Sequence, residues 1–235
     1  MADFINYAHR GASEYLPENT MLAFYSGIYM GANGIETDVQ RAKDGTLVLF
    51  HDDTLLRVTG EAGCVQDYTF EQLQQFDVTK NGFSDKIVTL EDFLQHFAFR
   101  DITFAIELKG AGVERDTADL LRKYRLEEKA VVTSFRLDYL ENFRSYAPEF
   151  QIGYLTASTE DSILQQLKEM QAEEYCPEAH LMTPELVNKW HSLGFRVRAW
   201  GVYNPDLMRH AFACGADGMT VNFPDLLTAH LKDTE

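Results

Sequence analysis

Cysteine is scarce in this chain, with Cys64, Cys176 and Cys214 the three examples among 235 residues. They are far apart and lack the paired spacing of a zinc site, so we expect reduced thiols, as in a cytoplasmic protein. No apolar stretch approaches the roughly 20 residues of a membrane span. The first residues lack the basic start of a secretion signal. We therefore expect no stable membrane insertion.

Positive charge is also scarce, with 21 Lys and Arg against 37 Asp and Glu and a formal net charge of −16. Such a chain has no bulk attraction for nucleic acid or for an anionic membrane. An anionic substrate would therefore need a metal ion or a few placed cations. A hydrophobic content of 45% fits a globular protein with a sizeable core. The sequence leaves open whether the chain forms a homo-oligomer.

Strand and helix patterns alternate along most of the chain. Short apolar runs typical of buried strands begin near residues 4, 34, 102, 130, 151, 172, 195 and 217. Amphipathic or capped helical segments lie between them, so the pattern predicts a parallel sheet closed into a (β/α)8 barrel, or TIM barrel, over a single domain, 1–235. Residues 54–86 break the rhythm and predict an inserted excursion with one short helix near Thr69 to Phe76. The side chains expected to form a small core of its own are Tyr68, Phe70, Leu73, Phe76 and Phe83.

The stretch from Gly34 to Asp53 carries a dense group of polar side chains. Glu36 and Asp38 alternate with apolar residues, so both carboxylates point to one face of a strand. Asp44-Gly45 predicts a two-residue hairpin turn, and that register places His51 directly opposite Asp38. A polar hairpin face in water would explain the same stretch, so this pattern alone leaves its chemistry open.

In a (β/α)8 barrel the carboxyl ends of the strands meet at one mouth, where the active sites of such enzymes lie. The strand ends and the hairpin supply two histidines, three acids and two cations, namely His9, His51, Glu36, Asp38, Glu107, Arg10 and Lys109. The acids are hard oxygen ligands that favour Mg²⁺ or Ca²⁺. The cations suit a phosphate group, and the histidines suit general acid and general base catalysis. Together these residues predict metal-assisted cleavage of a phosphoester.

The motifs around these residues are His9-Arg10-Gly11, Pro17-Glu18-Asn19-Thr20, Glu36-Thr37-Asp38, His51-Asp52 and Ile106-Glu107-Leu108-Lys109. They resemble those of the glycerophosphodiester phosphodiesterase family. The resemblance implies a barrel with a subdomain inserted after the second histidine, and hydrolysis of small glycerophosphodiesters to sn-glycerol 3-phosphate and an alcohol. It implies acid and base roles for His9 and His51. It also implies a divalent metal on Glu36, Asp38 and Glu107, and a phosphate on Arg10 and Lys109.

Looser matches follow later in the chain, among them Trp200, which is expected to line the pocket and contact the glycerol or the leaving alcohol. Two positions depart from the family pattern. Gly201-Val202-Tyr203-Asn204 stands where the family usually has Thr-Val-Asn, and Val221-Asn222 stands where it usually has Thr-Asp. We expect both departures to lie away from the three carboxylates and to affect substrate preference more than chemistry.

Two alternative functions stay open, a lysophospholipase D-type enzyme on the same barrel and a binding protein without catalysis. The residues do not decide which histidine is the acid. No Ser, Thr or Cys sits in the core motifs as an obvious nucleophile. Attack by the substrate's own glycerol hydroxyl is therefore favoured over attack by water, because a neighbouring hydroxyl has a large effective concentration.

Overall fold

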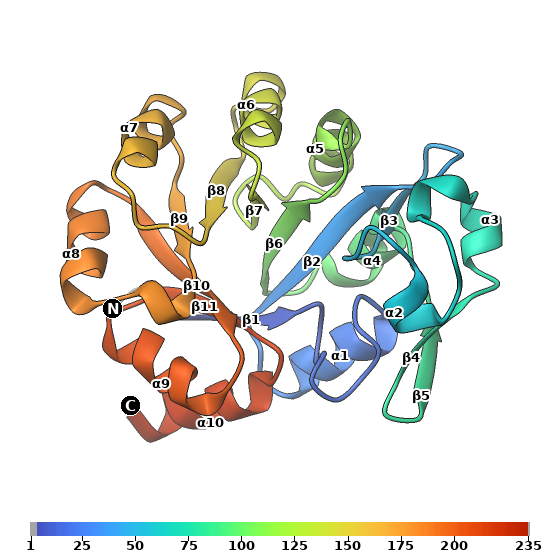
Figure 1. Ribbon diagram of the computed structural model, residues 1–235, viewed down its shortest axis with the longest axis horizontal. Helices are drawn as coiled ribbons and strands as arrows, with labels where there is room; N and C mark the ends of the chain where they lie inside the picture. Colours follow the sequence, from blue (N-terminus) through green and yellow to red (C-terminus); the bar gives the residue numbers. More distant parts are fainter. Residues whose placement is uncertain (1–3, 235) are drawn as a thin grey trace.

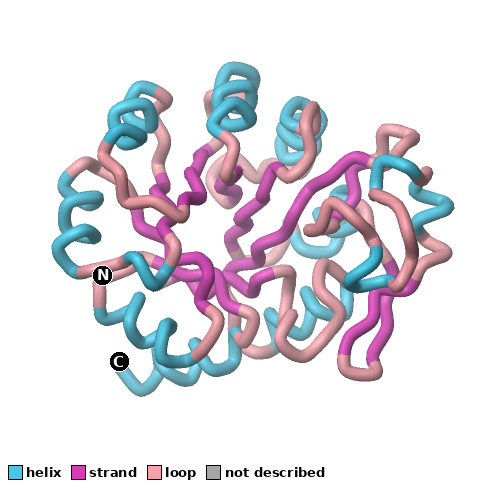
Figure 2. The backbone as a smooth tube through the Cα atoms, in the orientation of Figure 1, coloured by secondary structure: helices cyan, strands magenta, loops and turns pink. Residues whose placement is uncertain are grey.

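The computed structural model describes residues 4–234, and within them eight parallel strands close into a barrel (Figures 1 and 2). In order around the ring they are β1 (Ile5–His9), β2 (Gly34–Arg41), β6 (Thr103–Leu108), β7 (Ala130–Ser134), β8 (Gln151–Thr156), β9 (Glu174–Pro177), β10 (Arg196–Val202) and β11 (Gly218–Val221). The ring closes because β1 pairs with both β2 and β11. The predicted strands and the predicted barrel are confirmed.

Helices surround the barrel and cover its outer face (Figure 2). They are α1 (Met21–Tyr29), α4 (Leu90–Phe97), α5 (Glu114–Lys123), α6 (Leu137–Tyr146), α7 (Ser162–Glu169), α8 (Pro184–Ser192), α9 (Pro205–Ala213) and α10 (Pro224–Thr234). A short 3-10 helix, η2 (Ala179–Leu181), follows β9. Side-chain caps begin several of these helices; the Thr20 hydroxyl accepts from Ala23 N at 3.3 Å, and Asn204 Oδ1 accepts from Leu207 N at 2.9 Å.

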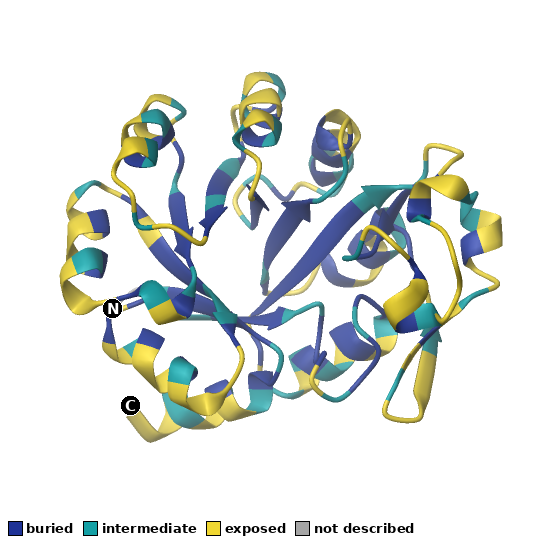
Figure 3. Cartoon of the chain, viewed as in Figure 1, coloured by how far each residue is buried: buried dark blue, intermediate teal, exposed yellow. Residues whose placement is uncertain are grey.

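The main core lies between the barrel and its helices. Ala130, Val131 and Val132 of β7 are all buried, as expected for strands that are covered on both faces. Figure 3 shows the same contrast across the molecule, with buried strands inside and exposed residues on the outer faces of the helices. Aromatic residues fill the space between the barrel and its helices; the ring centroids of Phe24 and Phe93 lie 4.7 Å apart. This core fixes the strand ends that form the mouth.

Residues 54–86 form several small elements beside β2 and α1 (Figure 1). They are α2 (Leu56–Thr59), η1 (Val65–Asp67), α3 (Phe70–Leu73) and the hairpin of β4 (Asp77–Lys80) with β5 (Phe83–Lys86). A second hydrophobic cluster holds them, and it includes Leu73, Tyr68, Phe70 and Phe76 as expected. Phe83 is 53% exposed, so its predicted place in that cluster is wrong. Of these elements only α3 was predicted.

The hairpin after β2 differs from the predicted one by one residue. β3 (Leu47–Leu49) pairs antiparallel with the end of β2, with Val39 opposite Leu49, and Phe50 N donates to Asp38 O at 3.0 Å. Ala42 N donates to Thr46 O at 2.9 Å, which leaves a three-residue loop. Gly45 has φ 92°, the left-handed conformation that such loops place at their last residue. Asp38 is therefore opposite Phe50, and the predicted pairing of Asp38 with His51 is wrong.

Cys64, Cys176 and Cys214 are free thiols in the described part of the chain, residues 4–234. None of the helices in those residues has the length and apolar character needed to cross a bilayer.

Candidate active site

A cavity of about 290 Å³ lies at the carboxyl ends of the barrel strands. Seven of the eight residues predicted for the site line it, namely His9, Arg10, Glu36, His51, Glu107, Lys109 and Trp200. The eighth, Asp38, is fully buried on β2, the strand that carries Glu36, and it pairs with Glu107 of β6. The barrel thus brings together side chains that are far apart in the sequence.

Three carboxylates meet where β2 lies beside β6. Glu36 and Asp38 share one face of β2, and Asp38 pairs directly with Glu107 on β6. One ligand atom from each carboxylate lies within 4.8 Å of the other two. Within residues 4–234, Asp38 Oδ1 is buried without a hydrogen-bond partner, as a free ligand atom would be. The Asp38 oxygen lies 3.9 Å from Lys109 Nζ but makes no hydrogen bond within the described residues, so it and the other carboxylates form a donor set that fits a divalent cation.

Crowded negative charge governs the protonation of these carboxylates. Burial and the charge of Asp38 raise the pKa of Glu107 to about 7. Burial, Asp38 and Glu107 together raise the pKa of Glu36 well above its ordinary value. Burial acts on Asp38 in the same direction, but cationic neighbours led by Arg10 outweigh it and hold the pKa of Asp38 below its usual range. A cation among the three would stabilise their charged forms and displace retained protons.

Two cationic side chains stand against the carboxylates at the cavity wall. Arg10 Nε lies 3.1 Å from Asp38 Oδ2, and Lys109 Nζ lies 3.0 Å from Glu107 Oε1. Gly11 follows Arg10 with φ 83°, and a Cβ there would lie 2.6 Å from the carbonyl oxygen of Ala23. The chain can therefore leave β1 sharply against α1 only with glycine at this position.

His9 ends β1 and contacts β2 and the segment after β11. Its Nδ1 lies 2.5 Å from Asn222 Oδ1, and its Nε2 lies 3.8 Å from Glu36 Oε2. Asn222 Oδ1 also accepts from Ser13 Oγ at 3.1 Å, so His9 Nδ1 is the donor in their pair. Burial and Arg10 lower the pKa of His9 well below its ordinary value, which leaves the ring neutral. Asn222, which departs from the family pattern, therefore lines the cavity and contacts His9.

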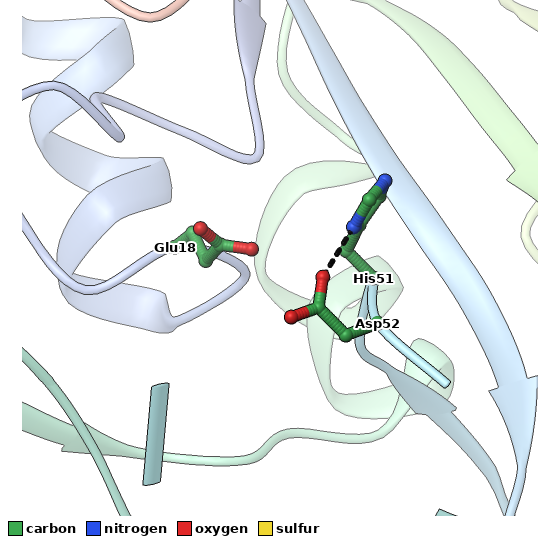
Figure 4. Close-up of side chains that lie close together, drawn as sticks. All are labelled: Glu18, His51 and Asp52. Atoms are coloured by element: carbon green, nitrogen blue, oxygen red, sulfur yellow. Dashed lines mark hydrogen bonds and ion pairs between the residues drawn. The ribbon is translucent and has the colours of Figure 1, made fainter. Parts of the chain in front are cut away.

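His51 lies just beyond β3, in the segment that leaves the hairpin. Because β3 ends at Leu49, the changed register does not turn His51 away, and its side chain lines the cavity. Its Nδ1 lies 2.7 Å from Asp52 Oδ1 (Figure 4). Burial lowers the pKa of His51, while the charge of Asp38 opposes that effect. The two histidines thus have different partners, a neutral amide for His9 and a carboxylate for His51.

Trp200 and Phe135 form an aromatic wall of the cavity. Their ring centroids lie 4.9 Å apart at an interplanar angle of 89°. Trp200 Nε1 donates to Thr156 O at 3.1 Å, which fixes the indole. Lys109 Nζ lies 5.8 Å from the centroid of the Phe135 ring. The wall therefore offers apolar contact directly beside a cation.

Asn19, for which the sequence predicted no site role, holds Asp38 in place. Its Nδ2 donates to Asp38 Oδ2 at 2.9 Å, and its Oδ1 accepts from Thr37 Oγ1 at 2.7 Å. Asn19 is buried and has φ 56°, a left-handed conformation in which Asn is enriched. The Pro17-Glu18-Asn19-Thr20 run is typical of a helix start, and Thr20 does cap α1. Because a helix start explains the whole run, nothing in the sequence indicates that Asn19 also contacts Asp38. Glu18, Asp52 and Arg57 likewise had no predicted role.

The fold and this site define the class of protein, a (β/α)8-barrel hydrolase of phosphoric diesters. The profile of the glycerophosphoryl diester phosphodiesterase family matches residues 9–226. A glycerophosphodiester phosphodiesterase of Caldanaerobacter subterraneus is 32% identical over 94% of this chain and 94% of its own length. The chain belongs to the glycerophosphoryl diester phosphodiesterase family.

Solved structures share the fold. A glycerophosphodiester phosphodiesterase from Agrobacterium tumefaciens is similar with a TM-score of 0.85 and 25% identity, covering 97% of this chain and 100% of that one. A phosphodiesterase from Oleispira antarctica, solved with its product sn-glycerol-3-phosphate, has a TM-score of 0.85 at 22% identity over 96% of both chains. At that identity the second likeness shows the barrel alone.

Proposed function

We propose that this enzyme hydrolyses small glycerophosphodiesters to sn-glycerol 3-phosphate and an alcohol, and that it depends on Mg²⁺ or Ca²⁺. The single observation that carries the proposal is the convergence of carboxylates, histidines and cations in one cavity. The proposed roles are cation binding for Glu36, Asp38 and Glu107, proton transfer for His9 and His51, and substrate binding for Arg10, Lys109 and Trp200. Residues 54–86 are an insertion within a single catalytic domain. The cytoplasmic location and the oligomeric state stay predictions.

The phosphate would lie between the cation site and the two basic side chains. A bound divalent cation supplies positive charge that polarises a phosphate and lowers the pKa of an attacking hydroxyl. Arg10 is held by Asp38 and Lys109 by Glu107, so both are oriented before substrate arrives. Preoriented charge stabilises the transition state without reorganisation during the reaction. Trp200 then packs on the carbon atoms of the glycerol or of the leaving alcohol.

The different partners of the histidines favour His9 as the base and His51 as the acid. His9 donates its Nδ1 hydrogen to an amide oxygen, so Nε2 keeps its lone pair for a substrate proton. His51 donates its Nδ1 hydrogen to the carboxylate of Asp52, which stabilises a ring that also carries a proton on Nε2. His9 takes the proton of the attacking hydroxyl, and His51 gives a proton to the departing alcohol.

The attacking group in this proposal is the glycerol hydroxyl next to the phosphate, and water then opens the cyclic phosphate. The test compares turnover of a glycerophosphodiester with that of an analogue in which hydrogen replaces this hydroxyl. Near-complete loss of cleavage with binding retained supports the hydroxyl route. Comparable turnover of both compounds would mean that water attacks directly.

The lysophospholipase D alternative needs an apolar channel for an acyl chain. Tyr68, Phe70 and Phe76 pack against the insertion's own cluster, and a cavity of about 290 Å³ suits a short headgroup. A coupled assay of glycerol 3-phosphate release on short-headgroup diesters, beside release of the headgroup alcohol from lysolipids, separates the two functions. Cleavage of the short diesters supports the proposal, and cleavage confined to lysolipids supports the alternative.

A further inference from the structure

Arg57, on the first helix of the 54–86 segment, joins carboxylates from two separate loops. Its Nε donates to Asp52 Oδ2 at 2.5 Å and its Nη2 to Asp52 Oδ1 at 2.9 Å. Its Nη1 donates to Glu18 Oε2 at 2.8 Å and its Nη2 to Glu18 Oε1 at 2.7 Å. One guanidinium therefore makes two-point contacts with both carboxylates, the strongest arrangement that arginine offers.

Each of these carboxylates holds a residue of the cavity. Asp52 Oδ1 lies 2.7 Å from His51 Nδ1 (Figure 4). Glu18 Oε1 accepts from Arg10 Nη1 at 2.9 Å, and Arg10 Nε in turn lies 3.1 Å from Asp38 Oδ2. Charges of alternating sign thus run without interruption from the three-carboxylate cluster through Arg57 to His51.

We propose that Arg57 is a positioning residue for the reaction, acting through Asp52 on His51 and through Glu18 on Arg10. This inference rests on the proposed function, since it needs His51 and Arg10 to act on substrate. His51 lies beyond the end of β3, where no strand pairing fixes it within the described residues. Without the guanidinium, the carboxylates of Glu18 and Asp52 would face each other and repel. They would separate and move His51 and Arg10 with them.

The same cluster could be read as a second metal site. Ligand atoms of Glu18, His51 and Asp52 lie within 4.8 Å of one another. Both carboxylates, however, already accept paired hydrogen bonds from Arg57, and Glu18 accepts one from Arg10 as well. The positive charge of the guanidinium therefore already compensates the two carboxylates, as a bound metal cation would. Counting the divalent ions bound per chain decides whether this cluster is a second metal site.

The test measures kcat and KM for wild type, Arg57→Ala and Arg57→Lys on a glycerophosphodiester. Loss of a group that orients a site residue typically lowers activity by about 10- to 100-fold, and we expect that loss in kcat for Arg57→Ala. The kcat of Arg57→Lys should lie between those of wild type and Arg57→Ala, because an ammonium group cannot make paired hydrogen bonds to both carboxylates. Added guanidinium should partly restore Arg57→Ala. Turnover close to wild type in Arg57→Ala would overturn the proposal.

Arg122→Ala is the matched control. Arg122 on α5 also bridges two carboxylates, with Nε 2.5 Å from Glu149 Oε1 and Nη1 3.0 Å from Asp119 Oδ1, away from the cavity. It should lose thermal stability as Arg57→Ala does but keep its kcat. An equal loss of kcat in both variants would mean that Arg57 contributes stability alone.

A ring spectrum of His51 provides a readout that does not depend on turnover. In ¹⁵N-labelled wild type we expect the tautomer with hydrogen on Nδ1, and in Arg57→Ala or Asp52→Asn a shift toward exchange between tautomers. An unchanged ring spectrum, or two divalent ions bound per wild-type chain with His51 as a ligand, would overturn the proposal. If wild type releases no glycerol 3-phosphate, the proposed function fails, and the spectrum still tests whether Arg57 orients His51.

Discussion

Replacing Glu107 by Gln in the metal-free protein should change how stability depends on pH. Burial and the charge of Asp38 raise the pKa of Glu107 from 4.5 to about 7. Between these values the folded protein binds a proton at Glu107 that the unfolded chain has released. The contribution of that proton to stability is complete below 4.5, the pKa of the carboxyl in the unfolded chain, and is lost as pH rises through about 7. Gln does not titrate, so the stability of the variant should not fall in this way as pH rises.

The size of the effect follows from the displacement of the pKa. One pKa unit corresponds to about 1.4 kcal/mol, so the shift of Glu107 to about 7 corresponds to about 3 kcal/mol of unfolding free energy. Relative to Glu107→Gln, wild type should lose an amount of this order between about pH 4.5 and pH 8. Glu36 loses a repelling neighbour in the variant, which adds to the difference in the same direction.

The assay is urea unfolding with a chelator present at the two ends of this pH range. Glu149→Gln, an exposed carboxylate paired with Arg122, is the control and should follow wild type. Adding Mg²⁺ or Ca²⁺ at the higher pH should restore the stability of wild type and act much less on Glu107→Gln. Parallel pH dependence in wild type and Glu107→Gln would refute the reasoning about the crowded carboxylates.

The remaining predictions concern the histidines. His9→Ala and His51→Ala should each lower kcat by about 100-fold or more with thermal unfolding little changed, because each removes one proton-transfer group; wild-type turnover in either variant would make that histidine structural. Asn222→Asp places a carboxylate against His9 Nδ1 and should raise the pKa of His9, so the acidic limb of the pH–rate profile should move to higher pH. An unmoved limb would contradict His9 as the base.

The barrel could be predicted because its strands are short apolar runs that are buried on both faces. The small elements of 54–86 could not, because a four-residue helix such as Leu56–Thr59 has too few turns to show periodicity. Packing of Val58, Val65 and Leu73 into a separate cluster holds these elements, and no local pattern in the sequence specifies that packing.

The residues at the mouth could be predicted from strand ends, but their contacts could not. Asn222 lies 213 positions from His9, so their contact depends on closure of the whole barrel. The hairpin register depended on loop length, since an Asp-Gly pair suits both two- and three-residue loops. His51 reaches the cavity despite the wrong register because β3 is short, a fact that the sequence pattern does not reveal.

The most direct measurement is sn-glycerol 3-phosphate release from a glycerophosphodiester by chelated protein, before and after Mg²⁺ or Ca²⁺ is added, with Asp38→Asn measured alongside. Asp38 lies in the centre of the carboxylate cluster, so its variant should lose the cation together with activity. We predict release only when the cation is present, and only from wild type. Equal release from metal-free and metal-loaded protein, or no release from wild type under either condition, would contradict the proposed function.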